Sequence, residues 1–200
     1  FAPGPATQFV IVNPSDGTAG TAVTVTVNAL DANNNIDTAY GTDVTLVTDG
    51  SATGGGVVDI VAGTGSLDIN DLVTETVNLS LSDHLTTGLT VTSTQDIVFA
   101  SGAATQFIIV DPTDGTAGTA ITVTIHALDV NNNISTSHGD DVTLVTDGSA
   151  TGGGVVDIVA GVGTININDL VAETVNLSLS DHLTTGLTVT STQDVLFAPG

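Results

Sequence analysis

The sequence predicts an all-β fold made of two tandem antiparallel β-sandwiches arranged head to tail. Three observations support this prediction. Apolar residues alternate with Thr, Ser and Asn along many short runs, which is the pattern of strands with one buried face and one solvated face. Turn-forming residues interrupt these runs at short intervals, and the whole pattern occurs twice. About seven short strands in each half is typical of a β-sandwich.

The strands are expected where the alternation is regular. In the first half the clearest runs cover residues 23–28, 76–82 and 89–94. Val and Thr dominate these runs, and β-branched side chains fit a pleated sheet better than a helix. A single helical turn near residues 83–87 is the one exception that the pattern allows. Turn signals separate the runs, at Asn13-Pro14, Asp16-Gly17, Asn33-Asn34-Asn35, Asp49-Gly50, Gly54-Gly55-Gly56 and Thr87-Gly88.

The two halves are close copies of each other. Residues 1–98 and 99–196 align without a gap and are identical at 78 of 98 positions. The period predicts two domains, 1–98 and 99–196, each restarting at Phe1 or Phe99. Residues 197–200 echo the opening Phe-Ala-Pro-Gly, so they are interpreted as the start of a further repeat or a C-terminal extension. Repetition this faithful favours a role based on length, display or polymerisation.

The connection between the two repeats is short. Only Ser101-Gly102-Ala103 separates the last expected strand of one repeat from the first expected strand of the next. A long Gly/Ser-rich segment would behave as a flexible coil, whereas this connection has almost no free length. We therefore expect a stiff junction between the domains.

The chain is strongly acidic. It contains no Lys and no Arg but 22 acidic residues, which gives a formal net charge of −22. Nucleic acids and anionic membranes are bound through cationic side chains, so both partner classes are excluded. No apolar run approaches the roughly 18 residues of a membrane span, and membrane insertion is not expected. Without Lys or Arg, the carboxylates must be stabilised by backbone N–H groups, hydroxyls, water or bound cations.

One Asp/Asn-rich loop in each repeat predicts a calcium site. Calcium binds six to eight oxygens, and closely spaced Asp and Asn side chains can supply several of them. The loop lacks two features of an EF-hand, because Ile36 replaces its Gly and Thr42 replaces its last Glu. The alternative is an Asx-rich turn without a metal. The candidate ligands are Asp31, Asn33, Asn35 and Asp37 in the first repeat, and Asp129, Asn131 and Asn133 in the second.

A second acidic group follows later in each repeat. Its members are Asp68, Asn70, Asp71 and Glu75 in the first copy, and Asn166, Asn168, Asp169 and Glu173 in the second. Only three of the four positions keep their residue type. Solvated turn residues are the favoured interpretation of this group.

The sequence predicts no enzymatic activity. Ser82-Asp83-His84 contains the residue types of a hydrolytic triad, but adjacent residues cannot form the relay because triad members meet in space with particular directions. No Gly-x-Ser-x-Gly elbow accompanies it. No catalytic and no cofactor-binding residue is therefore assigned, and calcium is the only expected cofactor.

Four segments of the first repeat resemble the bacterial Ig-like repeats of extracellular surface adhesins. They are Ala6–Val12, Thr18–Val27, Ala29–Asn35 and Gly41–Leu46. The resemblance extends over nearly the whole of both repeats. It implies Ig-like sandwiches, and a turn between two strands at the Asp-Ala-Asn segment. In that family many copies make the stalk of a large cell-surface protein. The total lack of Lys and Arg departs from the family's usual pattern.

These observations predict a structural repeat of a microbial extracellular fibre or cell-surface stalk, stiffened by calcium if the loops bind it. Its expected partners are neighbouring copies of itself, in a homopolymer or a long tandem array. The alternative is an adhesin module that binds glycan or ice. Aromatic platforms for sugars are scarce, since the chain has no Trp, one Tyr and five Phe.

Overall fold

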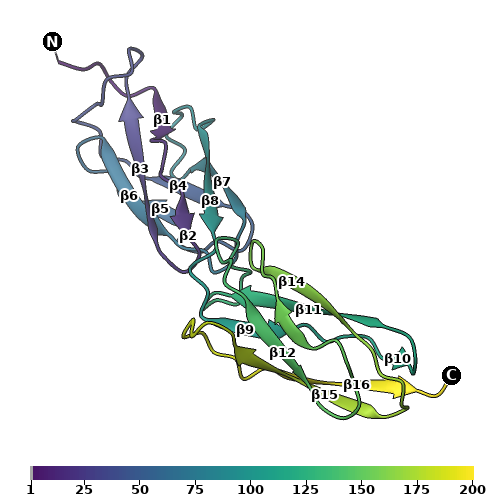
Figure 1. The fold of residues 1–200 in the computed structure, drawn as a ribbon. Helices are drawn as coiled ribbons and strands as arrows, with labels where there is room; N and C mark the ends of the chain where they lie inside the picture. Colours follow the sequence, from purple (N-terminus) through teal and green to yellow (C-terminus); the bar gives the residue numbers. More distant parts are fainter. Residues whose placement is uncertain (1) are drawn as a thin grey trace. The chain divides into compact units, whose positions relative to one another are not determined.

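The structure is a computed structural model that describes residues 2–200. The chain forms two compact units, of which the first ends at Ala100 and the second covers Ser101–Gly200. In Figure 1 the first unit runs from purple to teal, and the second ends in yellow. Each unit is an all-β sandwich of eight strands. The described residues contain no helix long and apolar enough to cross a membrane.

The strand bounds correspond closely between the units. The first unit contains β1 (Gln8–Ile11), β2 (Gly17–Thr18), β3 (Val23–Leu30), β4 (Val44–Thr48), β5 (Gly56–Val58), β6 (Thr64–Ile69), β7 (Thr76–Asp83) and β8 (Thr94–Ala100). The second contains β9 (Gln106–Ile109), β10 (Gly115–Thr116), β11 (Ile121–Leu128), β12 (Val142–Thr146), β13 (Gly154–Val156), β14 (Val162–Ile167), β15 (Thr174–Asp181) and β16 (Thr192–Ala198).

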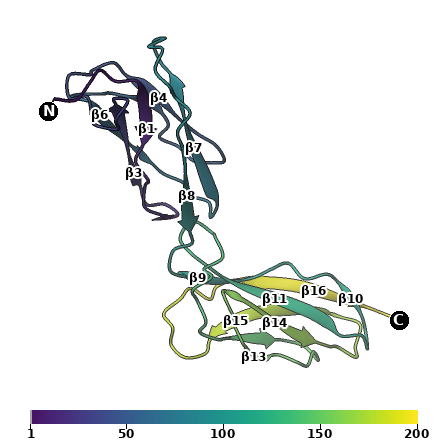
Figure 2. The ribbon, with the colours of Figure 1, turned by 90° about the horizontal axis from the view of Figure 1, so that it is seen from above.

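Each unit packs a three-stranded sheet against a five-stranded sheet. In the first unit the orders are β1-β3-β6 and β2-β8-β7-β4-β5, and the second unit repeats both. All strand pairs are antiparallel except β2 with β8 and β10 with β16, which are parallel. Figure 2 shows the same strands from a second direction, with β1, β3 and β6 of the first unit close together. Two packed sheets whose neighbouring strands are often not consecutive in sequence form the architecture of an Ig-like sandwich.

The core of each unit comes from the alternation that the sequence shows. In β3 the side chains of Val23, Val25 and Val27 are buried, and Thr24 between them is exposed. In β7 the buried positions are Val77, Leu79 and Leu81. Each such side chain contributes roughly 1.5–3 kcal/mol when fully removed from water. The all-β prediction and the two tandem sandwiches are therefore confirmed.

Two local predictions are wrong. The expected strand at residues 89–94 is reduced to an isolated bridge between Gln8 and Thr90, and β8 begins only at Thr94. No helical turn forms at residues 83–87. Instead, the Asp83 carboxylate accepts hydrogen bonds from the backbone N–H groups of Thr87 and Gly88, at 3.0 and 3.2 Å. The carboxylate closes this loop without helical bonds.

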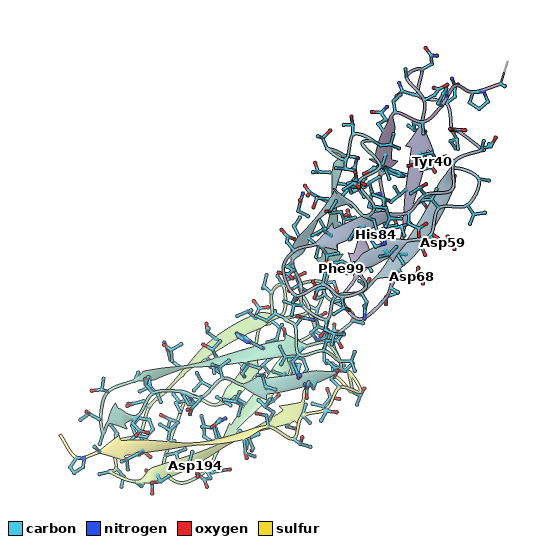
Figure 3. All side chains as sticks on the ribbon, turned by 180° about the vertical axis from the view of Figure 1, so that it is seen from behind. Tyr40, Asp59, Asp68, His84, Phe99 and Asp194 are labelled. Carbon is cyan, nitrogen blue, oxygen red and sulfur yellow. The ribbon has the colours of Figure 1, made fainter. Side chains whose placement is uncertain are left out.

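The boundary between the units lies two residues beyond the boundary of the sequence repeat. Phe99 belongs to β8, is 1% exposed and packs in the core of the first unit, where Figure 3 shows it within the ribbon. Phe197 occupies the same place at the end of β16. Phe99 therefore ends a unit and does not restart one, and residues 197–198 complete the second unit. Phe1 lies outside the described residues.

Candidate functional site

The Asp-Asn loop of the first unit, residues 31–37, is organised by one buried carboxylate. Asp31 follows β3 and is 2% exposed. Its Oδ1 accepts hydrogen bonds from the backbone N–H groups of Asn33 and Asn35, at 2.8 and 2.9 Å. Its Oδ2 accepts one from the N–H of Gly4, at 2.8 Å. Asn34 adopts the left-handed conformation, with φ 63°, which Asn tolerates well. The carboxylate thus closes its own turn and holds the N-terminal segment.

The second unit repeats this arrangement around its own N-terminal segment. Asp129 is 1% exposed, and its Oδ1 accepts the N–H groups of Asn131 and Asn133, both at 2.9 Å. Its Oδ2 accepts the N–H of Gly102 at 2.9 Å. Gly102 lies two residues after the end of β8. The first residues of the second unit are therefore held to the body of that unit by this carboxylate.

The pKa values of both carboxyls are lowered by these hydrogen bonds. In Asp31 the N–H groups of Asn35 and Gly4 lower the pKa from 3.8 to about 2, against an opposing effect of burial. For Asp129, burial is the largest single influence on the pKa, and it opposes ionisation. The N–H groups of Gly102 and Asn133 outweigh that effect, so the pKa lies below its ordinary value. Hydrogen bonds donated to a carboxylate favour its charged form.

Position 37 in the first unit and the equivalent position 135 in the second hold the N-terminal segment of their unit through different side chains. Asp37 accepts the backbone N–H of Ala6 at 2.9 Å and that of Ala39 at 3.0 Å. In the second unit Ser135 stands there, is fully buried, and donates its hydroxyl to the carbonyl of Gly102 at 2.8 Å. Both side chains fasten the segment that leads into their unit. The Asp-to-Ser difference therefore preserves the attachment and removes one charge.

The candidate calcium ligands of the loops are thus placed in a turn. The two oxygens of Asp31 and of Asp129 each already accept main-chain N–H groups, and the amides of Asn35 and Asn133 also contact them. Asn33 is exposed, and it contacts Asp31 through its backbone N–H. A metal ion at this loop would have to displace these bonds. Calcium binding here stays a prediction, and the geometry favours the Asx turn.

Backbone N–H groups also donate hydrogen bonds to three further carboxylates in each unit. In the first unit they are donated by Val98 to Asp16, by Ile60 to Asp43 and by Asn78 to Asp49, at 2.7–3.1 Å. Asp114, Asp141 and Asp147 make the matching bonds in the second unit. Such bonds are stronger than neutral ones because the acceptor is charged. The acidic residues therefore fix turns in a chain that has no cationic Lys or Arg.

A different arrangement follows β6, where Asn70 and Asp71 lie near Glu75 and Ser51. We call these four residues the β6–β7 cluster. The Ser51 hydroxyl lies 2.6 Å from Asp71 Oδ1 and 2.8 Å from Glu75 Oε1. Asp71 Oδ1 also accepts the N–H of Val73 at 2.9 Å, and the N–H of Ser51 donates to Glu75 Oε1 at 2.6 Å. Two carboxylates thus converge on one hydroxyl group.

Two oxygens of this cluster are buried without a hydrogen bond. They are Asp71 Oδ2 and Asn70 Oδ1, which have no hydrogen-bond partner among residues 2–200. Burial opposes ionisation of Asp71, but hydrogen bonds from Ser51 and Val73 hold its pKa below the ordinary value. The second unit reproduces the cluster with Ser149, Asn168, Asp169 and Glu173, including both unpaired oxygens. Sequence reasoning missed Ser51, because it lies 20 residues from Asp71 and no motif connects them.

The Ser-Asp-His segment is dispersed by the fold. Asp83 is engaged by Thr87, whose backbone N–H and hydroxyl lower the pKa of its carboxyl. His84 is exposed, and its Nδ1 lies 3.4 Å from the hydroxyl of Thr45 on β4. The Asp83 carboxylate therefore points to its own loop and not to the histidine. No relay of the triad type is formed by these residues.

Comparison with solved structures shows related folds. FdeC, an adhesin of Escherichia coli, matches with a TM-score of 0.54 and 18% identity, over 99% of this chain and 67% of that one. InvD of Yersinia pseudotuberculosis matches with a TM-score of 0.47 and 22% identity, over 96% of this chain and 57% of that one. A β-glycosidase from Bacteroides vulgatus has a TM-score of 0.45 and 12% identity, over 94% and 24%. No family model matches the chain, and no curated protein matches its sequence.

Together, the topology and the likeness to FdeC define the class of fold. The chain consists of two tandem Ig-like sandwich domains, and their fold is similar to that of the adhesin FdeC. At 18% identity the likeness concerns the fold, and the fold alone does not assign a function.

Proposed function

We propose that this chain is a non-catalytic spacer segment of a microbial extracellular surface protein, forming part of a stalk or fibre. Its partners are neighbouring copies of the same Ig-like unit, in one long chain or in a polymer, and bound calcium contributes to its stiffness. The fold likeness to a surface adhesin supports this proposal. So does the repetition of one unit with few changes.

The observation that carries the proposal is the attachment of the connecting segment. β8 ends at Ala100, and Ser101 and Gly102 already make hydrogen bonds within the second unit, to Thr136, Asp129 and Ser135. The first two residues after β8 are therefore already held in place by the second unit. A connection of this kind has little of the freedom of a flexible linker. Restricted motion at this connection suits a segment that acts as a rigid spacer.

The acidic composition suits the same role. Trypsin-like proteases cut after Lys and Arg, and this chain has neither. The net charge of −22 keeps neighbouring copies apart at low salt, and salt or divalent cations screen that repulsion. A protein exposed outside a cell gains from both properties.

The experiment measures the distance between the units with spin labels. The chain has no cysteine, so Asp59→Cys with Asp157→Cys places one label on an exposed position of each unit. Pulsed electron paramagnetic resonance, run in chelator, is expected to give a narrow distance distribution. Inserting a six-residue Gly/Ser segment between Ala100 and Ser101 should broaden it. A wild-type distribution as broad as that of the insertion variant would reject the spacer role, and specific retention on a glycan array would favour a binding module.

A further inference from the structure

Two buried carboxylates in the first unit differ in how completely their oxygens are hydrogen-bonded. Asp31 and Asp71 are 2% and 1% exposed, so both are removed from water. Both oxygens of Asp31 accept hydrogen bonds. In Asp71 only Oδ1 does so, and Oδ2 has no hydrogen-bond donor among residues 2–200. A buried charged oxygen without a donor costs free energy and requires an explanation.

Other oxygens of the β6–β7 cluster also have too few hydrogen-bond donors among residues 2–200. Asn70 Oδ1 is also buried without a donor in the described chain. The Ser51 hydroxyl carries a single hydrogen, yet it lies within 2.8 Å of oxygens of both Asp71 and Glu75. One hydrogen cannot satisfy both contacts. The cluster is therefore rich in oxygen lone pairs and poor in positive charge, and no Lys or Arg exists in the chain to supply it.

Space for a ligand is present at the same place. A cavity of about 300 Å³ is lined by Ser51, Thr53, Asn70, Asp71, Leu72 and Val73. It is large enough for an ion with several water molecules, since one water occupies about 30 Å³ in the liquid. The unpaired oxygens thus belong to residues that line an open cavity.

We propose that the β6–β7 cluster binds a divalent cation of the calcium type, with Asp71 Oδ2, Asn70 Oδ1 and the Glu75 carboxylate as protein ligands. Ser51 positions the two carboxylates, and water reaching the ion through the cavity completes the six to eight oxygens that calcium prefers. Calcium suits this set better than magnesium, which demands a tighter octahedron. Ser149, Asn168, Asp169 and Glu173 form the equivalent site in the second unit.

Recurrence within the chain supports this assignment. The four positions of the cluster are identical in both units, and each unit leaves the same two oxygens unpaired. Elsewhere acidic positions do change between the units, as Asp37 to Ser135 and Asp68 to Asn166. This inference deepens the calcium element of the proposed function, whereas the spin-label experiment is performed in chelator, so the two can fail separately.

Calorimetric titration of the full chain with CaCl2 tests the site. In about 0.15 M NaCl, which screens diffuse attraction to the acidic surface, we expect two ions per chain. The double variant Asp71→Asn with Asp169→Asn keeps the side-chain shape and should bind none, and Asp71→Asn alone should bind one. The matched control is Asp59→Asn with Asp157→Asn, which removes two exposed charges and should still bind two.

A thermal shift provides the second measurement. Millimolar CaCl2 should raise the unfolding temperature of the wild type and of the control above its value in chelator, because a ligand that binds only the folded state stabilises it. If the Asp71 and Asp169 double variant fails to fold, Asn70→Ala with Asn168→Ala tests the same site, with an expected affinity loss of at least about tenfold. Absence of calcium binding by the wild type would overturn the proposal. Unchanged binding by the cluster variants, with loss on Asp31→Asn and Asp129→Asn, would overturn it in favour of the Asp-Asn loops.

Discussion

Asp129 accepts a 2.9 Å hydrogen bond from the backbone N–H of Gly102, the second residue after the end of the first unit. The same carboxylate closes its own loop through Asn131 and Asn133. One buried side chain therefore links a turn of the second unit to the segment that arrives from the first. Asp31 and Gly4 make the equivalent contact in the first unit.

Replacing Asp129 by Ala should destabilise the second unit. The change leaves three main-chain N–H groups without their charged acceptor, and unsatisfied buried donors are costly. We expect the unfolding temperature to fall by about 5 °C or more, since a loss of about 1 kcal/mol already shifts a domain of this size by several degrees. Differential scanning calorimetry measures this change. Asp157→Ala, at an exposed position, removes the same charge and should have little effect; equal losses in both variants would contradict the role of Asp129.

Stability should fall in acid. The pKa of Asp31 is about 2 in the folded chain against an ordinary 3.8, and the pKa values of Asp71, Asp83, Asp129, Asp169 and Asp181 are also lowered. A lowered folded-state pKa contributes stability that is present above the ordinary value and is lost as the pH falls through the folded value. Urea unfolding should therefore show stability that declines from about pH 4 to pH 2. A rise over that interval would mean that relief of charge repulsion dominates.

Phe99 should stabilise the first unit and Phe197 the second. Truncating a buried Phe to Ala typically costs about 3–5 kcal/mol, and each ring lies in the core of the unit that it ends. Hydrogen exchange with peptide resolution should show faster exchange in residues 8–100 for Phe99→Ala, and in residues 106–198 for Phe197→Ala. If Phe99→Ala instead loosens the second unit, the boundary after Ala100 is wrong.

Salt should stabilise the chain. The chain has 22 acidic side chains and no Lys or Arg, so screening reduces repulsion and weakens no Lys or Arg ion pair. We expect the unfolding temperature to rise when NaCl is increased from about 0.01 M to about 0.5 M. Scanning calorimetry in chelator measures the effect without calcium. A decrease would show that the favourable carboxylate interactions are more sensitive to salt than the repulsion is.

The sequence was sufficient to predict the architecture because the two sheets are each half buried. Alternation in the segments that form β3 and β7 marks their inner faces directly. The two-residue strand β2 left no such signal, since Gly17 and Thr18 are too few to show a period. A repeat also determines the length of a unit and not where it begins; in the structure Phe99 lies near the end of β8, in the core of the first unit.

The site was less predictable for a different reason. A carboxylate surrounded by Asn residues has the same sequence whether its oxygens meet a cation or the N–H groups of its own turn. In Asp31 the deciding donor, Gly4, lies 27 residues away. For Asp71 the structure favours a cation instead. Neither the contact with Ser51 nor the unpaired Oδ2 could be predicted from the sequence, because both depend on the folded arrangement of β6 and the loop after β4.

The amide exchange rate of Gly102 tests the account most directly. If the Asp129 carboxylate holds the connecting segment, this amide should exchange with solvent at least about tenfold more slowly than a free backbone amide, as measured by NMR in chelator. Asp129→Ala should abolish that protection, while Asp157→Ala should leave it unchanged. An unprotected Gly102 amide in the wild type would contradict the claim that this carboxylate holds the first residues of the second unit in place.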